Sequence, residues 1–297
     1  MICKGCPHKY ERSEPFLQLS ISVKNQKSIQ QSLNTFIQGE MLEGDNAYLC
    51  EKCDKKVDTL KRTCIKKLPK YLIVALRRFE FDYDKMIRVK VNDYCEFPLD
   101  LNLEPYTQEG LSKRERIQKL KEEKGEEEAQ AAIEEIENEP LKYPKEYYEF
   151  SLSGIVVHSG TADSGHYYSF IKDREHPETG KWYEMNDHIV RDFDPNDIPS
   201  ECFGGEDVFQ GYNMMQMKTM KWRNAYLLLY ERKVPVDIGN SDDEKETEKT
   251  NNSSVVDTTT KESVNKDGDI EMLQPLNSVK ISNEIESKIA YENQKYW

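Results

Sequence analysis

One histidine of this chain stands where a run of small residues enters a strand, a position suited to proton transfer. His166 follows SGTADSG and opens the expected strand GHYYSFIKD, and the next strand, KWYEMND, ends at Asn186 and Asp187. Neighbouring antiparallel strands would bring these side chains beside the imidazole. An Asn or Asp that accepts a hydrogen bond from Nδ1 would fix the tautomer and leave Nε2 free as a base. A purely structural histidine is the alternative, and His158, at the end of the preceding strand, is a weaker candidate base.

Two C-x-x-C pairs offer a second kind of chemistry, metal binding. Cys3 and Cys6 form the first pair, and Cys50 and Cys53 form the second. Four thiolates suit a tetrahedral Zn²⁺, and a closed shell without a site for water predicts a structural ion. The long separation between the pairs indicates that the ion joins two hairpin tips. An iron–sulfur cluster or free thiols are the alternatives. His8, two residues after Cys6, could substitute as a ligand, but we expect it to be a bystander.

Composition narrows the class of protein. The 297 residues include 42 Lys and Arg against 55 Asp and Glu, a formal charge of −13, which argues against nucleic-acid binding. No apolar run approaches the roughly 18 residues of a membrane span, and the start, MICKGCPHKY, lacks the apolar core of a signal peptide. The odd number of cysteines, 7, favours a reducing compartment. We therefore expect a soluble cytoplasmic protein, with the nucleus as the alternative location.

The elements that must position these residues are mostly strands. Alternating or continuous apolar patterns predict strands. The predicted strands are residues 17–23, 71–81, 147–160, 165–173, 181–187 and 222–232. One helix is expected after Ser28, because Ser28 and Gln31 form a capping-box pattern. Its apolar positions then fall on one face; they are Ile29, Leu33, Phe36 and Ile37. The folded part is therefore α+β, with an antiparallel sheet in its second half.

Two polar segments stand apart from this pattern. Residues 111–138 are highly charged with a thin apolar stripe, which predicts a helical surface insertion without a specific function. Residues 235–297 carry 14 acidic and 7 basic side chains and few apolar ones, so we expect a disordered acidic tail. Its end, ISNEIESKIAYENQKYW, has apolar residues at near-helical spacing, and a short helix that docks on a partner is the alternative there.

Several of these segments together resemble one enzyme family. The pattern CKGC, CEKC, KKLPKYLIVALRRFEFD, GIVVHSGTADSGHYYSFIKD, KWYEMND and NAYLLLYER is similar to the ubiquitin-specific proteases, which are cysteine deubiquitinases. The segments CPHKYER, GDNAYLCEKCDKK, CEFPLDLNLEPYT and ECFGGE resemble the large fat-facets-like members. The resemblance covers residues 1–234 apart from the insertion.

The resemblance implies a papain-like fold with fingers, palm and thumb. The fingers would be residues 1–70, with zinc in a ribbon held by Cys3, Cys6, Cys50 and Cys53, and the palm residues 71–234. His166 would be the general base of a thiol protease, Asn186 its orienting partner and Asp187 an assisting acid. The reaction would be hydrolysis of the peptide or isopeptide bond after the C-terminal glycine of ubiquitin. The expected partners are therefore ubiquitin and ubiquitinated proteins, with neither nucleic acid nor a membrane.

The sequence departs from the family pattern at the position of the nucleophile. The family places it in a Gly- and Asn-rich box upstream of the first zinc pair, and no such box precedes Cys3 here. Cys64, Cys95 and Cys202 lack the Gly-rich approach to a helix that would activate a thiol. We therefore expect a partial catalytic domain without the thumb, inactive by itself and completed by a missing N-terminal part. A non-catalytic ubiquitin-binding module and a zinc-clipped interaction scaffold are the alternatives.

Overall fold

The computed structural model describes residues 1–210 and 216–236. Almost all of the predicted acidic tail, with its expected terminal helix, therefore lies outside the described residues. Within the described part, no helix is both long and apolar enough to cross a membrane.

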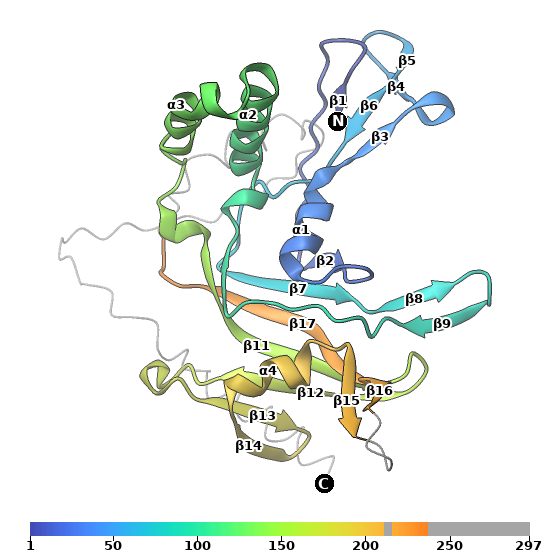
Figure 1. Cartoon of the computed structure of the whole chain (residues 1–297), viewed down its shortest axis with the longest axis vertical. Coiled ribbons are helices and arrows are strands. Elements are labelled where there is room, and N and C mark those ends of the chain that lie inside the picture. The colour runs from blue at the N-terminus through green and yellow to red at the C-terminus, as the bar shows by residue number, and fades with distance from the viewer. Residues whose placement is uncertain (211–215, 237–297) are drawn as a thin grey trace, which may run out of the picture. The chain divides into compact units, whose positions relative to one another are not determined.

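An eight-stranded sheet forms the centre of the structure (Figure 1). Its strands follow the order β14-β13-β12-β11-β17-β7-β2, and β10 also pairs with β11. They are β2 Leu19–Ser22, β7 Tyr71–Arg77, β10 Asp100–Asn102, β11 Glu149–Gly160, β12 Gly165–Lys172, β13 Trp182–Asn186, β14 Ile189–Phe193 and β17 Arg223–Arg232. All of these pairs are antiparallel except β2 with β7. The predicted antiparallel sheet of the second half is present.

The sheet is held by apolar side chains of its central strands and by helix α1 (Ile29–Gln38). Leu76 of β7, Val157 of β11 and Leu228 of β17 are fully buried. The predicted helix is confirmed: the Ser28 side chain accepts from the backbone N–H of Gln31, and the predicted apolar face packs on the sheet. Each buried side chain of this size contributes roughly 1.5–3 kcal/mol through loss of apolar surface to water.

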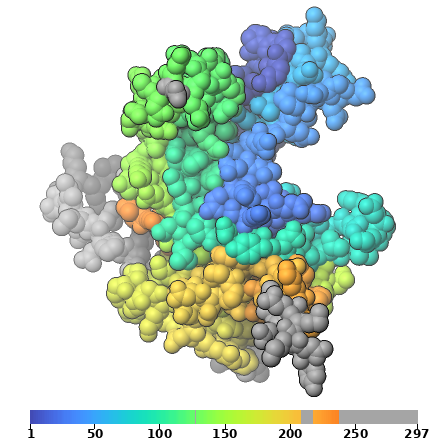
Figure 2. Space-filling model, in the orientation of Figure 1, coloured from blue at the N-terminus to red at the C-terminus, as the bar shows by residue number. Residues whose placement is uncertain are grey.

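The predicted strand 71–81 is divided in two at Arg78. The chain turns there, β8 (Phe79–Asp82) leaves the large sheet, and β8 pairs with β9 (Ile87–Lys90) in a hairpin. The guanidinium of Arg78 is fully buried and donates to the backbone carbonyls of Val91, Asp93 and Ala225. Hydropathy alone does not reveal this turn, because the residue that makes it is charged and buried. Figure 2 shows the hairpin as the cyan projection.

The N-terminal third forms small sheets beyond α1. One has the order β1-β6-β3, and the other pairs β4 with β5. The strands are β1 Ile2–Cys3, β3 Glu40–Leu42, β4 Tyr48–Cys50, β5 Lys55–Val57 and β6 Thr59–Lys61. Short, half-exposed strands of this kind bury little apolar surface. They therefore need another source of stability, which the cysteines between them can supply.

The charged insertion is a helical hairpin packed on its neighbours. Helix α2 (Gln108–Lys124) and helix α3 (Glu126–Glu137) meet at Gly125, whose φ of 80° ends the first helix. Arg62 and Glu115 form an ion pair between α2 and the N-terminal third. The helical prediction for 111–138 is confirmed, and α2 begins three residues earlier, where Thr107 caps it.

The remaining elements are short. They are helix α4 Ile198–Cys202, strands β15 Glu206–Gln210 and β16 Gln216–Met220, and the 3₁₀ turns η1 Gly44–Asn46, η2 Glu104–Tyr106, η3 Lys145–Tyr148, η4 Pro177–Thr179 and η5 Pro195–Asp197. Strands β15 and β16 pair only with each other.

The sheet centre should determine the stability of the whole palm. We expect Leu228→Ala to lower the free energy of unfolding by about 2–5 kcal/mol, because it leaves a cavity in the core. Leu229→Ala is the matched control on the same strand; Leu229 is 36% exposed, so the loss should stay below about 1 kcal/mol. Urea unfolding followed by tryptophan fluorescence measures both. Equal losses would contradict this assignment of the core.

Candidate active site and metal centre

His166 is placed by the pairing of β11 with β12. Ser159 of β11 lies opposite His166 in this register. Alternate residues of a strand share a face, so His166 and Tyr168 point the same way, into a cavity of about 470 Å³. The cavity is lined by Ser159, His166, Tyr168, Phe170, Glu184, Asn186, Phe193, Asp197 and Glu201. It therefore combines an aromatic wall with three carboxyl groups beside the imidazole.

The predicted partner of His166 is in contact with it. The Oδ1 of Asn186 lies 2.7 Å from Nε2 of His166. The amide nitrogen of Asn186 donates to Glu184 at 3.3 Å, so the oxygen of the amide faces the imidazole. Because an amide oxygen only accepts hydrogen bonds, Nε2 must carry the proton. The neutral ring then has its lone pair on Nδ1.

This geometry reverses one sequence prediction. The spacing of the strands led us to expect Asn186 on Nδ1 and a free Nε2, whereas Asn186 occupies Nε2. The nitrogen available as a base is therefore Nδ1. Strand spacing brings the two residues together but does not encode the rotation of the imidazole about its side-chain bonds, and that rotation decides which nitrogen faces the partner.

Asp187 lies farther from the imidazole. Its Oδ2 is 3.8 Å from Nε2, and its side chain is 70% exposed. Such an exposed pair contributes at most about 1 kcal/mol to the protonated imidazole. Asp187 occupies a left-handed backbone conformation, with φ of 53°, immediately after β13. This turn keeps the carboxylate near the ring while Asn186 makes the direct hydrogen bond.

His158, the weaker candidate, lies on the opposite face of β11 from Ser159. It is 4% exposed and packs against Phe79 and Tyr167, with ring centroids 5.1 and 4.7 Å away. Burial lowers the pKa of His158, so the ring stays neutral at physiological pH. Its position indicates a packing role.

The three single cysteines have unfavourable surroundings for a nucleophile. Burial raises the pKa of Cys64, and it raises the pKa of Cys95 to about 11. Burial also raises the pKa of Cys202 well above its ordinary value. Attack requires the thiolate, and none of the three lines the cavity at His166.

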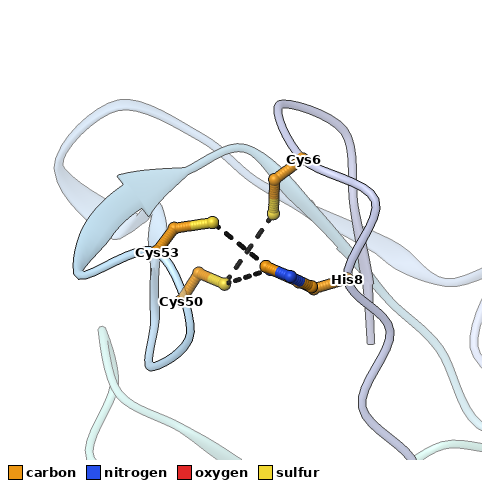
Figure 3. Close-up of side chains that lie close together, drawn as sticks. All are labelled: Cys6, His8, Cys50 and Cys53. Carbon is orange, nitrogen blue, oxygen red and sulfur yellow. Dashed lines mark hydrogen bonds between the residues drawn. The ribbon is translucent and has the colours of Figure 1, made fainter.

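The second candidate site lies between the loop after β1 and the turn after β4 (Figure 3). Ligand atoms of Cys6, His8, Cys50 and Cys53 all lie within 4.8 Å of one another. The Nδ1 of His8 is 3.4 Å from Sγ of Cys50 and 3.2 Å from Sγ of Cys53, and the two sulfurs of Cys6 and Cys50 are 3.7 Å apart. Three thiols and one imidazole gathered this closely are a ligand set of the kind that binds structural zinc.

This set differs from the one expected from the C-x-x-C pairs. Cys3 lies outside the group, and His8 takes its place. Cys3 belongs to β1, where it faces Thr59 of β6, and its backbone N–H donates to the carbonyl of His8 at 3.2 Å. That bond folds the intervening residues into a loop that carries Cys6 and His8 at its tip. The C-x-H spacing of Cys6 and His8 is the sequence signal for this ligand pair, but the regular C-x-x-C pattern favours Cys3 as the ligand instead.

Tyr10 supports the metal site from its edge. Its hydroxyl lies 3.1 Å from Sγ of Cys50, and this contact, with help from His8, lowers the pKa of Cys50 to about 5. The same contact raises the pKa of Tyr10 to about 12, so the phenol keeps its proton and donates it to the sulfur. The lowered pKa favours the thiolate form of Cys50, which is the form that binds a metal.

Comparison with known proteins identifies the family. The sequence profile described as "Ubiquitin carboxyl-terminal hydrolase" matches residues 3–230. The chain belongs to the ubiquitin carboxyl-terminal hydrolase family. The resemblance predicted from the motifs is confirmed, and members of this family are cysteine-type ubiquitin hydrolases.

Relatives and solved structures agree with this assignment. The chain is 43% identical over 236 residues to Ubiquitin carboxyl-terminal hydrolase 24 of Homo sapiens, covering 78% of this chain and 9% of that protein. It is 42% identical over 241 residues to Probable ubiquitin carboxyl-terminal hydrolase FAF of Drosophila melanogaster, covering 78% and 8%. It thus spans less than a tenth of these curated relatives.

Among solved structures, the chain is similar to the SAGA DUB module containing Ubp8 bound to monoubiquitin. The TM-score is 0.53 at 26% sequence identity, and the match covers 79% of this chain and 39% of the neighbour's chain. This neighbour, together with the antiparallel sheets, confirms the predicted fold class of a ubiquitin-specific protease.

Metal analysis distinguishes the two ligand sets. We expect about one zinc per purified chain, lost in His8→Ala and in Cys50→Ser, because each removes one of four ligands from a closed shell. Cys3→Ser is the matched control and should keep the ion. Zinc retained by His8→Ala and lost from Cys3→Ser would instead support the set of four cysteines.

Proposed function

We propose that this chain is the C-terminal part of a deubiquitinase catalytic domain. The reaction is thiol-dependent hydrolysis of the peptide or isopeptide bond after the C-terminal glycine of ubiquitin. The observation that carries the proposal is the hydrogen bond between His166 and Asn186, which leaves Nδ1 as the available base. Ubiquitin as substrate is supported by the names of the relatives and by the monoubiquitin bound to the SAGA DUB module.

The nucleophile is proposed to come from a segment outside this chain. The surroundings of the single cysteines support this, because burial raises the pKa of each of them. The remaining cysteines belong to the finger region, where Cys6, Cys50 and Cys53 gather with His8. A thiol delivered at the open side of the cavity would meet Nδ1 of His166.

In this mechanism His166 moves one proton in each half-reaction. Its Nδ1 takes the proton from the attacking thiol, whose sulfur bonds to the carbonyl carbon after the ubiquitin glycine. The imidazolium then gives that proton to the departing amine as the carbon–nitrogen bond breaks. In the second half, Nδ1 takes a proton from the water that attacks the thioester carbon, the carbon–sulfur bond breaks, and the proton returns to the sulfur. The amide oxygen of Asn186 holds the Nε2–H throughout.

The charge around the cavity suits a cationic peptide. Glu184, Asp197 and Glu201 line it, and Arg223 pairs with Glu201 at 2.6 Å. The carboxylates of Glu184 and Asp197 therefore remain to attract basic residues of a substrate, which favours orientation and a fast encounter more than affinity. We place the protein in the cytoplasm, with the nucleus as the alternative, since its free cysteines suit a reducing compartment.

The alternative is a ubiquitin-binding module without chemistry or a zinc-clipped interaction scaffold. The buried surroundings of the single cysteines favour it for the chain alone, whereas the oriented imidazole favours descent from an enzyme. Zinc in the fingers has a structural role in all three.

Turnover of ubiquitin joined to a fluorogenic C-terminal amide tests the proposal. We expect no turnover by the chain itself and turnover by the natural protein extended upstream through a cysteine box. An extended protein that binds ubiquitin without turnover would favour the binding module. Turnover by the short chain that is abolished by Cys64→Ala would overturn the assignment of the nucleophile.

Within the extended enzyme, His166→Ala should lower kcat by roughly 10²–10⁴-fold, the range for loss of a general base. The Kd for ubiquitin, measured by titration, should change little. His176→Ala is the matched control, because His176 is an exposed histidine beside Asp173, and it should leave both quantities unchanged. Turnover that survives His166→Ala would show that His166 is structural.

A further inference from the structure

Within residues 1–210 and 216–236, the ammonium group of Lys90 donates to three backbone carbonyls and to no side chain. Its Nζ donates to the carbonyl oxygens of Trp222 at 2.6 Å, His158 at 2.9 Å and Gly160 at 3.2 Å. Lys90 is the last residue of β9, and its three acceptors lie at the end of β11 and just before β17. One side chain therefore joins the projecting hairpin to two strands of the large sheet.

Burying an ammonium group is costly unless hydrogen bonds or an opposite charge compensate for the lost water. Burial and the neighbouring Arg78 guanidinium lower the pKa of Lys90 to about 8. The charged or titratable groups that face it are Arg78, from the junction of β7 and β8, and His158, from β11. Within the described residues, no carboxylate pairs with its ammonium, so the carbonyls are its stabilising partners.

Two of the acceptors of Lys90 lie one residue to either side of the cross-strand partner of the candidate base. The carbonyls of residues 158 and 160 flank Ser159, which is the cross-strand partner of His166. The carbonyl of Trp222 accepts a second bond, from the backbone N–H of Gly160 at 3.0 Å. These bonds fix the strand end from which the loop 160–165 departs.

The loop itself has few side chains that could fix it. Its sequence is GTADSG, closed by a hydrogen bond from Thr161 N–H to the Ser164 carbonyl at 2.8 Å. A side chain at Gly165 would meet Nε2 of His158 at 2.2 Å, so the return strand can approach only because this residue is glycine. A loop without large side chains depends on backbone bonds at its base for its position.

We propose that Lys90 is a positioning residue for His166. Its ammonium holds the carbonyls on both sides of Ser159, and through the β11–β12 register this keeps the imidazole against Asn186. The inference deepens the proposed function and rests on it for its catalytic meaning. Its structural content, the link from Lys90 to the His166 proton, can be measured without turnover.

Nuclear magnetic resonance of the zinc-loaded chain, labelled at histidine, lysine and backbone nitrogen, tests this link. In the wild type, the amides of residues 158–166 should shift with the same midpoint as the Lys90 side chain, near pH 8. Arg78 stays charged and His158 stays neutral over this range, so neither produces that transition. The same amides unmoved while Lys90 titrates would overturn the proposal.

Variants test the same link independently. In Lys90→Met, the pH-8 transition should disappear, the Nε2–H tautomer of His166 should lose its dominance, and amide exchange at residues 158–166 should quicken by about tenfold or more. Lys90→Arg keeps a charged donor and should restore most of the protection. Lys85→Met is the matched control, because Lys85 is an exposed lysine of the same hairpin, and it should change none of these signals.

The outcomes separate the two proposals. A folded Lys90→Met protein with wild-type tautomer and exchange would overturn the positioning role, whatever the enzyme does. If Lys90→Met does not fold, the wild-type titration alone decides. A normal link between Lys90 and His166 in a protein whose extended form never turns over would reject the proposed function and leave the positioning role intact.

Discussion

The antiparallel pairing of β11, β12 and β13 is the constraint on which the rest of the site depends. It sets His166 opposite Ser159 and brings the end of β13 beside the imidazole. Side chains alternate between faces, so a slip by one residue would turn His166 toward the packed side occupied by His158 and Tyr167. The buried aromatic rings of Phe170 and Trp182 lie on the same face as His166 and oppose such a slip, because it would remove both rings from their packing in the core. The stability of the sheet and the geometry of the candidate site thus depend on the same register.

Much of this arrangement can be predicted from local patterns. The strands with continuous or alternating apolar residues and the capped helix after Ser28 need only short-range information. The hairpin after Arg78 does not follow from such a pattern. The bend at Arg78 is stabilised by the guanidinium of this residue, which donates to the carbonyls of Val91 and Ala225, two residues far apart in sequence. Strand β14 also escapes prediction, since its side chains are mostly exposed and its pairing with β13 alone defines it.

The candidate sites show a similar division between residue type and geometry. The sequence indicated that His166 and Asn186 act together and that paired cysteines bind metal. It did not indicate which imidazole nitrogen faces Asn186, or that His8 joins Cys6 at the loop tip. Both depend on where a strand ends and how a side chain rotates. Cys3 illustrates this, because its pairing opposite Thr59 of β6 places it in β1, outside the group of ligand atoms.

Arg78 and Lys90 both bind backbone carbonyls, and this kind of contact matters for the loop beside His166. A base at a cleft needs a loop of small residues next to it, so that a substrate and a nucleophile can approach. Such a loop buries little apolar surface and is therefore poorly held. Cations that bind backbone carbonyls, as Arg78 and Lys90 do, anchor the backbone without requiring a large side chain in the loop itself.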